Sequence, residues 1–353
     1  MNKKLIKLVQ WLQLAMLITA GVAVSAVQAQ VPMYEGADRT QRLLDGARQE
    51  GVLNLYSSMA EKDTSRVAKL FEEKYGIKVN VWRSGKDKVL QRAVAEGAAG
   101  RDAADFVWNV APEMEALHRE KLLQPVRSPL QKGLIPEALP KHGEWTGSMV
   151  YVFVQAYNSK RVSKEELPRT FQDLLDPRWK GRLGIEYKQQ EWFYKLMSIV
   201  GEEKGLNQFR TMVANNGLSV RVGSSLLANM VLSGEVDFAV TMYSFIVDQM
   251  KANGGNIDYV NLAPVIALTD GIGILKRAKH PYAATLFYDF MLSDGQKMIA
   301  ENYVPTTQTG DKNMARFAAA QFIDPALILD SYEKWLKLYE ETINNRGKGE
   351  IKK

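Results

Sequence analysis

Residues 51–81, GVLNLYSSMAEKDTSRVAKLFEEKYGIKVNV, hold a helix pattern between two strand patterns. The stretch begins with a short apolar run and ends with a run that alternates at the two-residue period of a strand. Between them Val67, Leu70 and Phe71 recur at helical spacing, and Gly76 stands where a left-handed helix cap belongs. Strand, helix and strand within about thirty residues predict a βαβ unit with parallel strands and a right-handed crossover.

The α/β pattern continues outward from this unit. A second helix is expected over residues 87–97, followed by a buried strand at residues 104–108. Residues 124–148 are rich in proline and glycine and predict a loop-rich stretch. Residues 157–255 then repeat the α/β style. Because 353 residues allow two domains, we expect an α/β protein with two lobes.

The chain is expected to cross between the lobes twice. Residues 149–156 are apolar and favour a strand, and residues 253–264 contain the break at Gly254-Gly255. The expected division is a signal peptide over 1–29, a first lobe of residues 30–148 with 264–353 and the C-terminal helices, and a second lobe of residues 149–263.

The first 29 residues have the layout of a secretory signal peptide. A basic start precedes a long apolar run over residues 8–26, and Ala29 supplies a small residue at the expected cut. The alternative is an uncleaved membrane anchor, but no basic stop-transfer flank follows the apolar run. Because the chain has no cysteine to carry a lipid, we expect an exported protein of a Gram-negative periplasm.

Composition excludes several classes of protein. Hydrophobic residues make up 46% and charged residues 24%, which is typical of a globular chain and not of a disordered or collagenous one. The formal charge is +6, and without Lys3, Lys4 and Lys7 of the leader it is about +3, with both signs interspersed. We therefore expect no nucleic-acid partner. The absence of cysteine excludes disulfides, thiolate metal sites and a cysteine nucleophile.

No recognisable catalytic set is present. His118, His142 and His280 are not within metal-ligand spacing of one another, so we expect no metal site. A G-x-S-x-G nucleophile elbow is missing, and residues 271–273 lack the third glycine of a dinucleotide fingerprint. We expect a binding protein without a cofactor and not an enzyme; an exported hydrolase is the alternative outside this class.

Six segments, in order, carry a family likeness: RQEGVL (48–53), YGIKV (75–79), AADFVW (103–108), DLLDPRWKGR (173–182), SGEVD (233–237) and AKHPYAA (278–284). Together they resemble the periplasmic solute-binding proteins of ABC importers, in the group that includes the ferric-binding proteins. The resemblance implies a type II periplasmic binding fold, in which two lobes joined by crossover strands close around a small solute. It also implies the permease and ATPase of an importer as partners, and we expect a monomer.

The ligand is expected beyond the carboxyl ends of the strands, where open α/β sheets bind their ligands. The predicted ligand-binding residues are Ser57, Ser58, Arg83, Ser84, Asn109, Ser224, Thr241 and Tyr243. For the serines the alternative stays open that they only form turns or cap helices. The helix after Gly223 would direct its free N–H groups at the cleft, and Arg83 would add a forked contact. These neutral donors predict a small organic anion as the cargo: a phosphonate, a phosphate ester or a carboxylate. The acids available to this cleft are Glu186 and Glu191.

Ferric iron is the alternative cargo. The resemblance implies for the ferric-binding relatives a histidine, a carboxylate and two adjacent tyrosines, completed by a small anion. In this chain Ala60 falls at the histidine place, Asn109 at the carboxylate place, and Ser244 beside Tyr243 at the tyrosine pair. On this pattern we expect no tight ferric binding.

Overall fold

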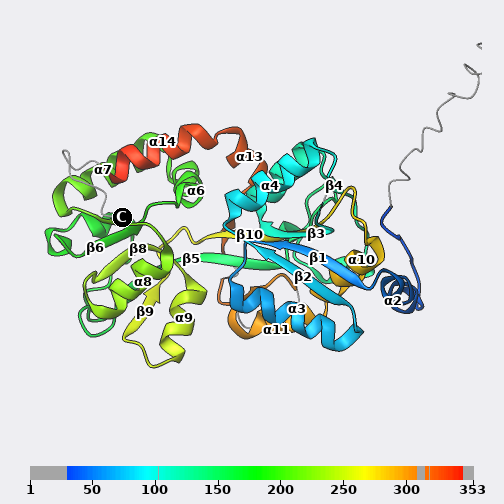
Figure 1. Cartoon of the computed structure of the whole chain (residues 1–353). Coiled ribbons are helices and arrows are strands. Elements are labelled where there is room, and N and C mark those ends of the chain that lie inside the picture. Colours follow the sequence, from blue (N-terminus) through cyan, green and yellow to red (C-terminus); the bar gives the residue numbers. More distant parts are fainter. Residues whose placement is uncertain (1–29, 102, 308–314, 318, 345–353) are drawn as a thin grey trace, which may run out of the picture.

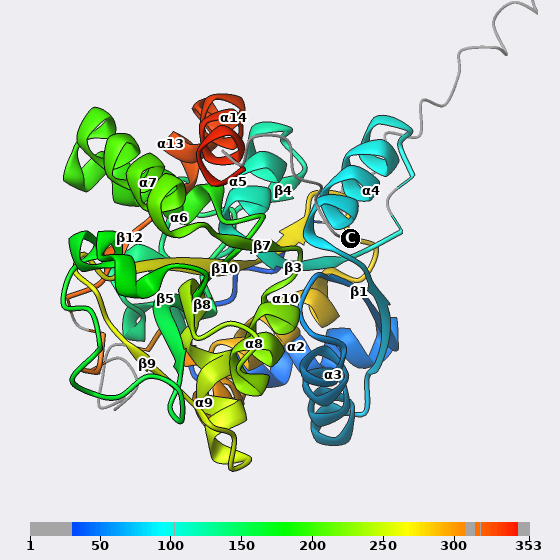
Figure 2. The same cartoon turned by 90° about the vertical axis from the view of Figure 1, so that its left-hand side faces the viewer.

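The structure is a computed structural model that describes residues 30–101, 103–307, 315–317 and 319–344. The expected signal peptide lies outside the described residues. Within them, no helix combines the length and the apolar character that a membrane span requires. Figures 1 and 2 show an elongated α/β molecule with two lobes.

The predicted βαβ unit is confirmed. Strand β1 (Val52–Ser57) pairs in parallel with β2 (Lys78–Arg83) and with β3 (Phe106–Val110). The connecting helix α3 (Glu61–Tyr75) buries Val67 and Phe71, whereas Leu70 is exposed. Gly76 ends the helix at a φ of 72°, a left-handed conformation that glycine adopts without strain. The helices of this lobe are α2 (Arg39–Glu50), α4 (Lys86–Ala98) and α5 (Ala111–Arg119), before the short strand β4 (Leu123–Gln124).

Two ten-residue strands run through both lobes. The sheet order is β2-β1-β3-β10-β5-β8-β6-β7, with β5 (Met149–Asn158) and β10 (Ile266–Leu275) antiparallel at its centre. One end of β10 pairs with β3 and the other with β5, while β5 pairs onward with β8 (Phe238–Tyr243). Strand β5 covers residues 149–156, the first of the two expected crossings. The second passage follows the expected residues 253–264 and is β10 itself.

The second lobe has its own short parallel sheet. Strand β6 (Leu183–Glu186) pairs in parallel with β7 (Ser219–Arg221) and with β8. The other elements here are α6 (Gln190–Val200), α7 (Glu202–Asn216), α8 (Ser224–Ser233), α9 (Ser244–Ala252) and β9 (Ile257–Val260). Single-turn 3₁₀ helices lie at Pro129–Gly133, Pro136–Ala138, Phe171–Leu175 and Pro177–Trp179.

The C-terminal region returns to both lobes. Its elements are α10 (Pro281–Met291), α11 (Asp294–Asn302), β11 (Val304–Pro305), β12 (Gln321–Phe322), α13 (Pro325–Asp330) and α14 (Tyr332–Ile343). Helix α13 packs on α5 of the first lobe, but α14 packs on α6 and α7 of the second. The Tyr339 and Phe193 rings lie 5.2 Å apart. The expected division had grouped all C-terminal helices with the first lobe.

The most distinctive sequence segment, residues 173–182, holds the second lobe together. Trp179 is fully buried against Phe238, with ring centroids 5.1 Å apart. Arg182 Nε donates to Asp237 Oδ2 at 2.6 Å, and Arg161 donates to the other oxygen of the same buried carboxylate. The segment therefore anchors the start of β8, the strand that ends at Tyr243.

Candidate functional site

A cavity of about 270 Å³ lies between the lobes, where the ends of β1, β3 and β8 meet the side of β5. Its polar lining includes Ser58, Asp63, Lys86 and three tyrosines. A larger cavity beside His142 lies away from this meeting of strands. The position beyond the carboxyl ends of parallel strands is the one in which α/β sheets bind ligands. We therefore take the cavity between the lobes as the candidate site.

The three tyrosines come from different elements. Tyr151 belongs to β5, Tyr243 ends β8, and Tyr303 follows α11. The rings of Tyr151 and Tyr243 are 5.5 Å apart. Burial is the main cause that raises the pKa of all three phenols, so each is neutral at neutral pH. Tyr151 donates its hydroxyl to Met59 Sδ at 3.0 Å, and Tyr303 donates to the Asp63 carboxylate.

A lysine lies between two buried carboxylates at one wall of the cavity. Lys86 Nζ is 2.8 Å from Glu191 Oε1 and 3.2 Å from Glu113 Oε1. Lys86 and Glu113 are in the first turns of α4 and α5, and Glu191 is in the first turn of α6, so the cluster joins the two lobes. Burial alone would lower the pKa of Lys86, but the charges of Glu191 and Glu113 raise it well above its ordinary value. Burial also raises the pKa of Glu113.

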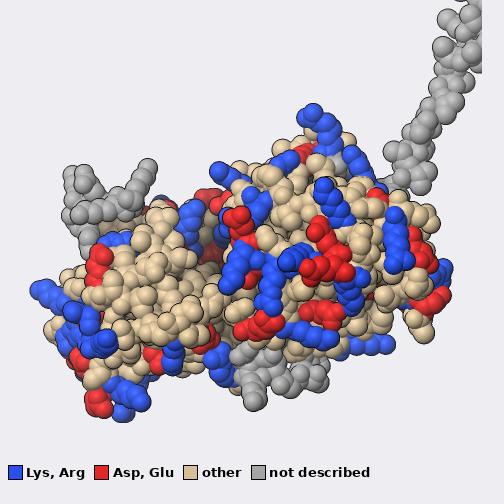
Figure 3. Space-filling view, turned by 60° about the horizontal axis from the view of Figure 1, so that its bottom comes forward, with Lys and Arg blue, Asp and Glu red and all other residues tan. Residues whose placement is uncertain are grey.

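Several buried oxygens around this cluster accept no hydrogen bond from the described residues: Glu113 Oε2, Gln189 Oε1, Gln190 Oε1 and Thr241 Oγ1. A buried polar atom without a partner costs free energy, so such atoms mark places where a bound group would fit. Every one of them is an oxygen. Three of the four are acceptor-only oxygens, and Figure 3 shows both acidic and basic side chains around the hollow between the lobes.

Four of the predicted ligand residues lie at or beside this site. Ser58 and Tyr243 line the cavity, and Thr241 lies two residues before Tyr243 on the same strand. Asn109 is buried and donates its Nδ2 to the Lys86 carbonyl at 3.1 Å, which positions the start of α4. Whether they bind a ligand stays a prediction.

The other four have different surroundings. Ser57 is buried and its Oγ accepts from the Met59 amide at 3.1 Å, as in a turn. Arg83 is exposed, and its Nε donates to the Met59 carbonyl at 2.9 Å. Ser84 is half-buried, and Ser224 Oγ lies 3.5 Å from Gln189 Nε2. The Arg83 guanidinium, which was expected to bind an anion through a forked contact, therefore donates to the protein backbone.

Sequence reasoning missed Lys86, Glu113 and the cavity tyrosines Tyr151 and Tyr303. Each of the two charged residues follows a strand end by a few positions, which is the one signal that the sequence offered. Glu191 was named only as an acid available to the cleft. Lys86, Glu113 and Glu191 come together because the first turns of α4, α5 and α6 converge.

Comparison with known proteins supports a single family. Residues 111–326 match the family described as bacterial extracellular solute-binding protein. The chain is 26% identical over 321 residues to iron uptake protein A1 of Synechocystis sp., covering 84% of this chain and 86% of the relative. It is 27% identical over 244 residues to the Fe(3+)-binding periplasmic protein of Serratia marcescens, covering 66% and 71% of the two chains.

Solved structures agree on the fold. Iron-bound HitA from Pseudomonas aeruginosa has a TM-score of 0.72 at 25% identity, covering 82% of this chain and 99% of that one. The apo ferric ion-binding protein A of Pasteurella haemolytica has a TM-score of 0.71 at 21% identity, covering 84% and 100%. The fold is the predicted type II periplasmic binding fold. These relatives are iron-binding proteins, and they contradict the predicted organic-anion cargo.

Proposed function

The chain belongs to the bacterial extracellular solute-binding protein family, and from this premise we propose that it binds ferric iron and delivers it to an ABC importer. The iron-binding relatives support the cargo. They are binding and transport proteins, not enzymes. The proposal replaces both the organic anion and the expectation of no tight ferric binding.

The observation that carries the proposal is the cluster in which Glu113 and Glu191 already hold a cation, the Lys86 ammonium. Hard cations are bound by oxygen ligands, and the anionic ones here are the two carboxylates that hold Lys86 at the cavity wall and the phenolate that Tyr243 would form. We infer that Glu113, Glu191 and Tyr243 bind the ion after the ammonium has moved away. Tyr243 lies close enough to this cluster for the charges of Glu191 and Lys86 to act on its phenol.

This ligand set differs from the one that the resemblance implies. Ala60 lines the cavity but has no donor atom, and Asn109 uses its side chain on the Lys86 carbonyl. Ser244 is buried at the start of α9. In the proposed site carboxylates from α5 and α6 replace the ligands missing from those positions. A small anion such as citrate would complete the shell, since the structurally similar Trichodesmium protein was solved in complex with iron and citrate ligands.

Ferric binding has to remove a proton from Tyr243, because burial raises the pKa of its phenol. Metal binding that displaces ligand protons weakens as the pH falls. Iron is therefore expected to bind near neutral pH and to be released in acid.

The experiment is a titration of the purified protein with ferric citrate, followed by visible absorption. A phenolate bound to ferric iron gives a charge-transfer band, which Tyr243→Phe is expected to abolish. Tyr259→Phe, a change to a half-buried tyrosine on β9 away from the cavity, is the matched control and is expected to keep the band. A wild-type protein that takes up no iron and shows no band would refute the proposal.

Export to the periplasm is part of the same proposal, since a carrier must meet its cargo outside the inner membrane. The leader-like residues 1–29 and the periplasmic relative from Serratia marcescens support it. N-terminal sequencing of the protein from a periplasmic extract is expected to begin at Gln30. A chain that starts at Met1 and stays with the membrane fraction would contradict cleavage.

A further inference from the structure

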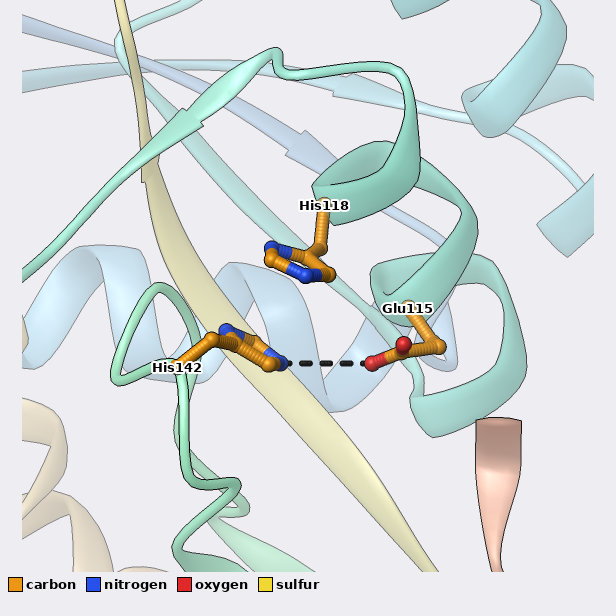
Figure 4. A group of neighbouring side chains, drawn as sticks. All are labelled: Glu115, His118 and His142. Atoms are coloured by element: carbon orange, nitrogen blue, oxygen red, sulfur yellow. Dashed lines mark hydrogen bonds and ion pairs between the residues drawn. The ribbon is translucent and has the colours of Figure 1, made fainter. Parts of the chain in front are cut away.

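A second group of ligand-type side chains lies outside the cavity between the lobes. Glu115 and His118 come from α5, and His142 comes from the loop that precedes β5 (Figure 4). Each contributes a ligand atom, and these atoms lie within 4.8 Å of one another. The spacing of the histidines in the sequence had argued against a shared site; the loop brings His142 back onto α5.

Neighbouring side chains orient this group. Glu144 Oε2 lies 2.8 Å from His118 Nδ1; because a carboxylate accepts, Nδ1 carries the proton and Nε2 keeps a free lone pair. A histidine backed by a carboxylate in this way is the usual arrangement around protein-bound metals. Trp145 Nε1 donates to Glu115 Oε2 at 3.4 Å, which fixes the second carboxylate. Arg119 Nε lies 3.7 Å from the other oxygen of Glu115.

We propose that Glu115, His118 and His142 bind a divalent transition-metal ion such as Zn²⁺. Two imidazoles and one carboxylate form a three-ligand zinc set that leaves a fourth position open. That position would face the cavity of about 460 Å³ that Glu115 and His142 line. Imidazole nitrogens favour Zn²⁺, Cu²⁺ or Ni²⁺ over hard ions, so this site differs in its chemistry from the all-oxygen cluster around Lys86.

The two imidazole rings have to turn before an ion binds. They are stacked with centroids 3.7 Å apart and planes 11° apart, so one ion cannot lie in the plane of both. His142 Nδ1 accepts from the Glu144 amide at 3.1 Å, so its Nε2 carries the proton that faces Glu115. Ligation of the metal through His142 Nε2 requires this proton to move to Nδ1, which breaks the hydrogen bond from the Glu144 amide. The rotation of the rings also breaks the stack. The side chains of His118 and His142 are 28% and 19% exposed, which leaves them room to turn.

The test is calorimetric titration of the protein with ZnCl₂ near neutral pH. Wild type is expected to bind one ion, and His118→Gln and His142→Gln are each expected to weaken binding by at least about tenfold, since even changes to the partners of metal ligands cost about 10–100-fold. Glu137→Gln changes an exposed carboxylate on the rim of the same cavity and is expected to bind as wild type does.

Two further measurements keep the result clear. Cobalt(II) is expected to give the strong visible absorption of a four-coordinate ion with wild type and not with His118→Gln. Thermal unfolding without metal verifies that each variant folds. If a histidine variant does not fold, Glu115→Gln is used in its place. Ferric citrate titration of His118→Gln is expected to match wild type, so the two sites are judged separately. No zinc uptake at millimolar concentrations, or histidine variants that bind as tightly as wild type, would overturn the proposal.

Discussion

The Lys86 ammonium of α4 lies 2.8 Å from the Glu191 carboxylate of α6, and this ion pair crosses from one lobe to the other. Glu113 shares the same ammonium from within the first lobe. In the proposed ferric site, the ion would take the place that the lysine occupies between these two carboxylates.

Replacing Lys86 with Met is expected to open the empty protein and to strengthen ferric binding. Two buried carboxylates without their cation repel each other, and the ion no longer has to displace an ammonium. We expect a larger radius of gyration by small-angle scattering, and a gain in affinity of about tenfold, the equivalent of about 1.4 kcal/mol. Lys88→Met changes an exposed lysine of the same helix and serves as the control. An unchanged radius together with weaker iron binding would argue that Lys86 assists the cargo.

Neutralising Glu191 is expected to have the opposite effect on ferric binding. Glu191→Gln removes one anionic ligand and leaves the Lys86 ammonium beside Glu113 alone. The loss of a charge-assisted contact is expected to cost about 1.5–3 kcal/mol, or roughly tenfold to a hundredfold in affinity. Competition for iron against a coloured chelator measures this. Equal affinity of Glu191→Gln and wild type would place the ligands elsewhere.

Asp270 predicts how stability depends on pH. Burial raises its pKa to about 6, although Ser148 and Met149 amides donate to it at 2.8 and 2.7 Å. Because the folded pKa lies above the ordinary 3.8, the folded state holds this proton more tightly. The contribution of Asp270 to stability is therefore complete below about pH 4 and is lost as the pH rises through about 6, a change of about 2–3 kcal/mol.

Urea unfolding of wild type and Asp270→Asn across this pH window measures the effect, and the variant is expected to lack it. Asp173 offers a control, because its pKa is shifted in the opposite direction to that of Asp270. Hydrogen bonds from the Arg169 and Thr170 amides lower its pKa, so its smaller contribution is lost as the pH falls. A difference between wild type and Asp270→Asn that does not change with pH would contradict the prediction.

Asp237→Ala is expected to destabilise the protein strongly. The change leaves Arg182, which is mostly buried, without its carboxylate beside Trp179. Removing one partner of a buried ion pair costs about 3–5 kcal/mol, and the exposure of Arg161 places this case near the lower end. Glu235→Ala, which removes an exposed partner of Arg221, is expected to change stability by less than about 1 kcal/mol. Chemical denaturation compares them; similar costs for both changes would be the contrary outcome.

The local patterns in the sequence predicted the fold well, and the reason is visible in the family-like segments. The Asp105 carboxylate accepts a hydrogen bond from the His280 amide at 3.0 Å and lies 2.8 Å from His280 Nδ1. Two of the family-like segments therefore hold β3 to the start of α10. In the second lobe, residues 173–182 hold the start of β8 in the same way, through the contact of Arg182 with Asp237. Such segments specify architecture, and for that reason they revealed the fold and not the cargo.

The candidate site was harder to predict because it depends on contacts between distant residues. Lys86, Glu113 and Glu191 each look like an ordinary charge in the first turn of a helix. Tyr243 was predicted as a ligand because it ends a strand, and it lines the cavity, whereas Arg83, which also ends a strand, donates to the Met59 carbonyl. The pattern of residues indicates where each strand ends, but the direction of a side chain there depends on the neighbouring turn.

The central pair β5 and β10 has a consequence for how the molecule melts. Each strand gives backbone hydrogen bonds to both lobes, and β10 pairs at one end with β3 and at the other with β5. Neither lobe can lose its sheet without taking a strand from the other. Calorimetry should therefore record one cooperative transition, with equal van't Hoff and calorimetric enthalpies, where two separately folding domains would give two.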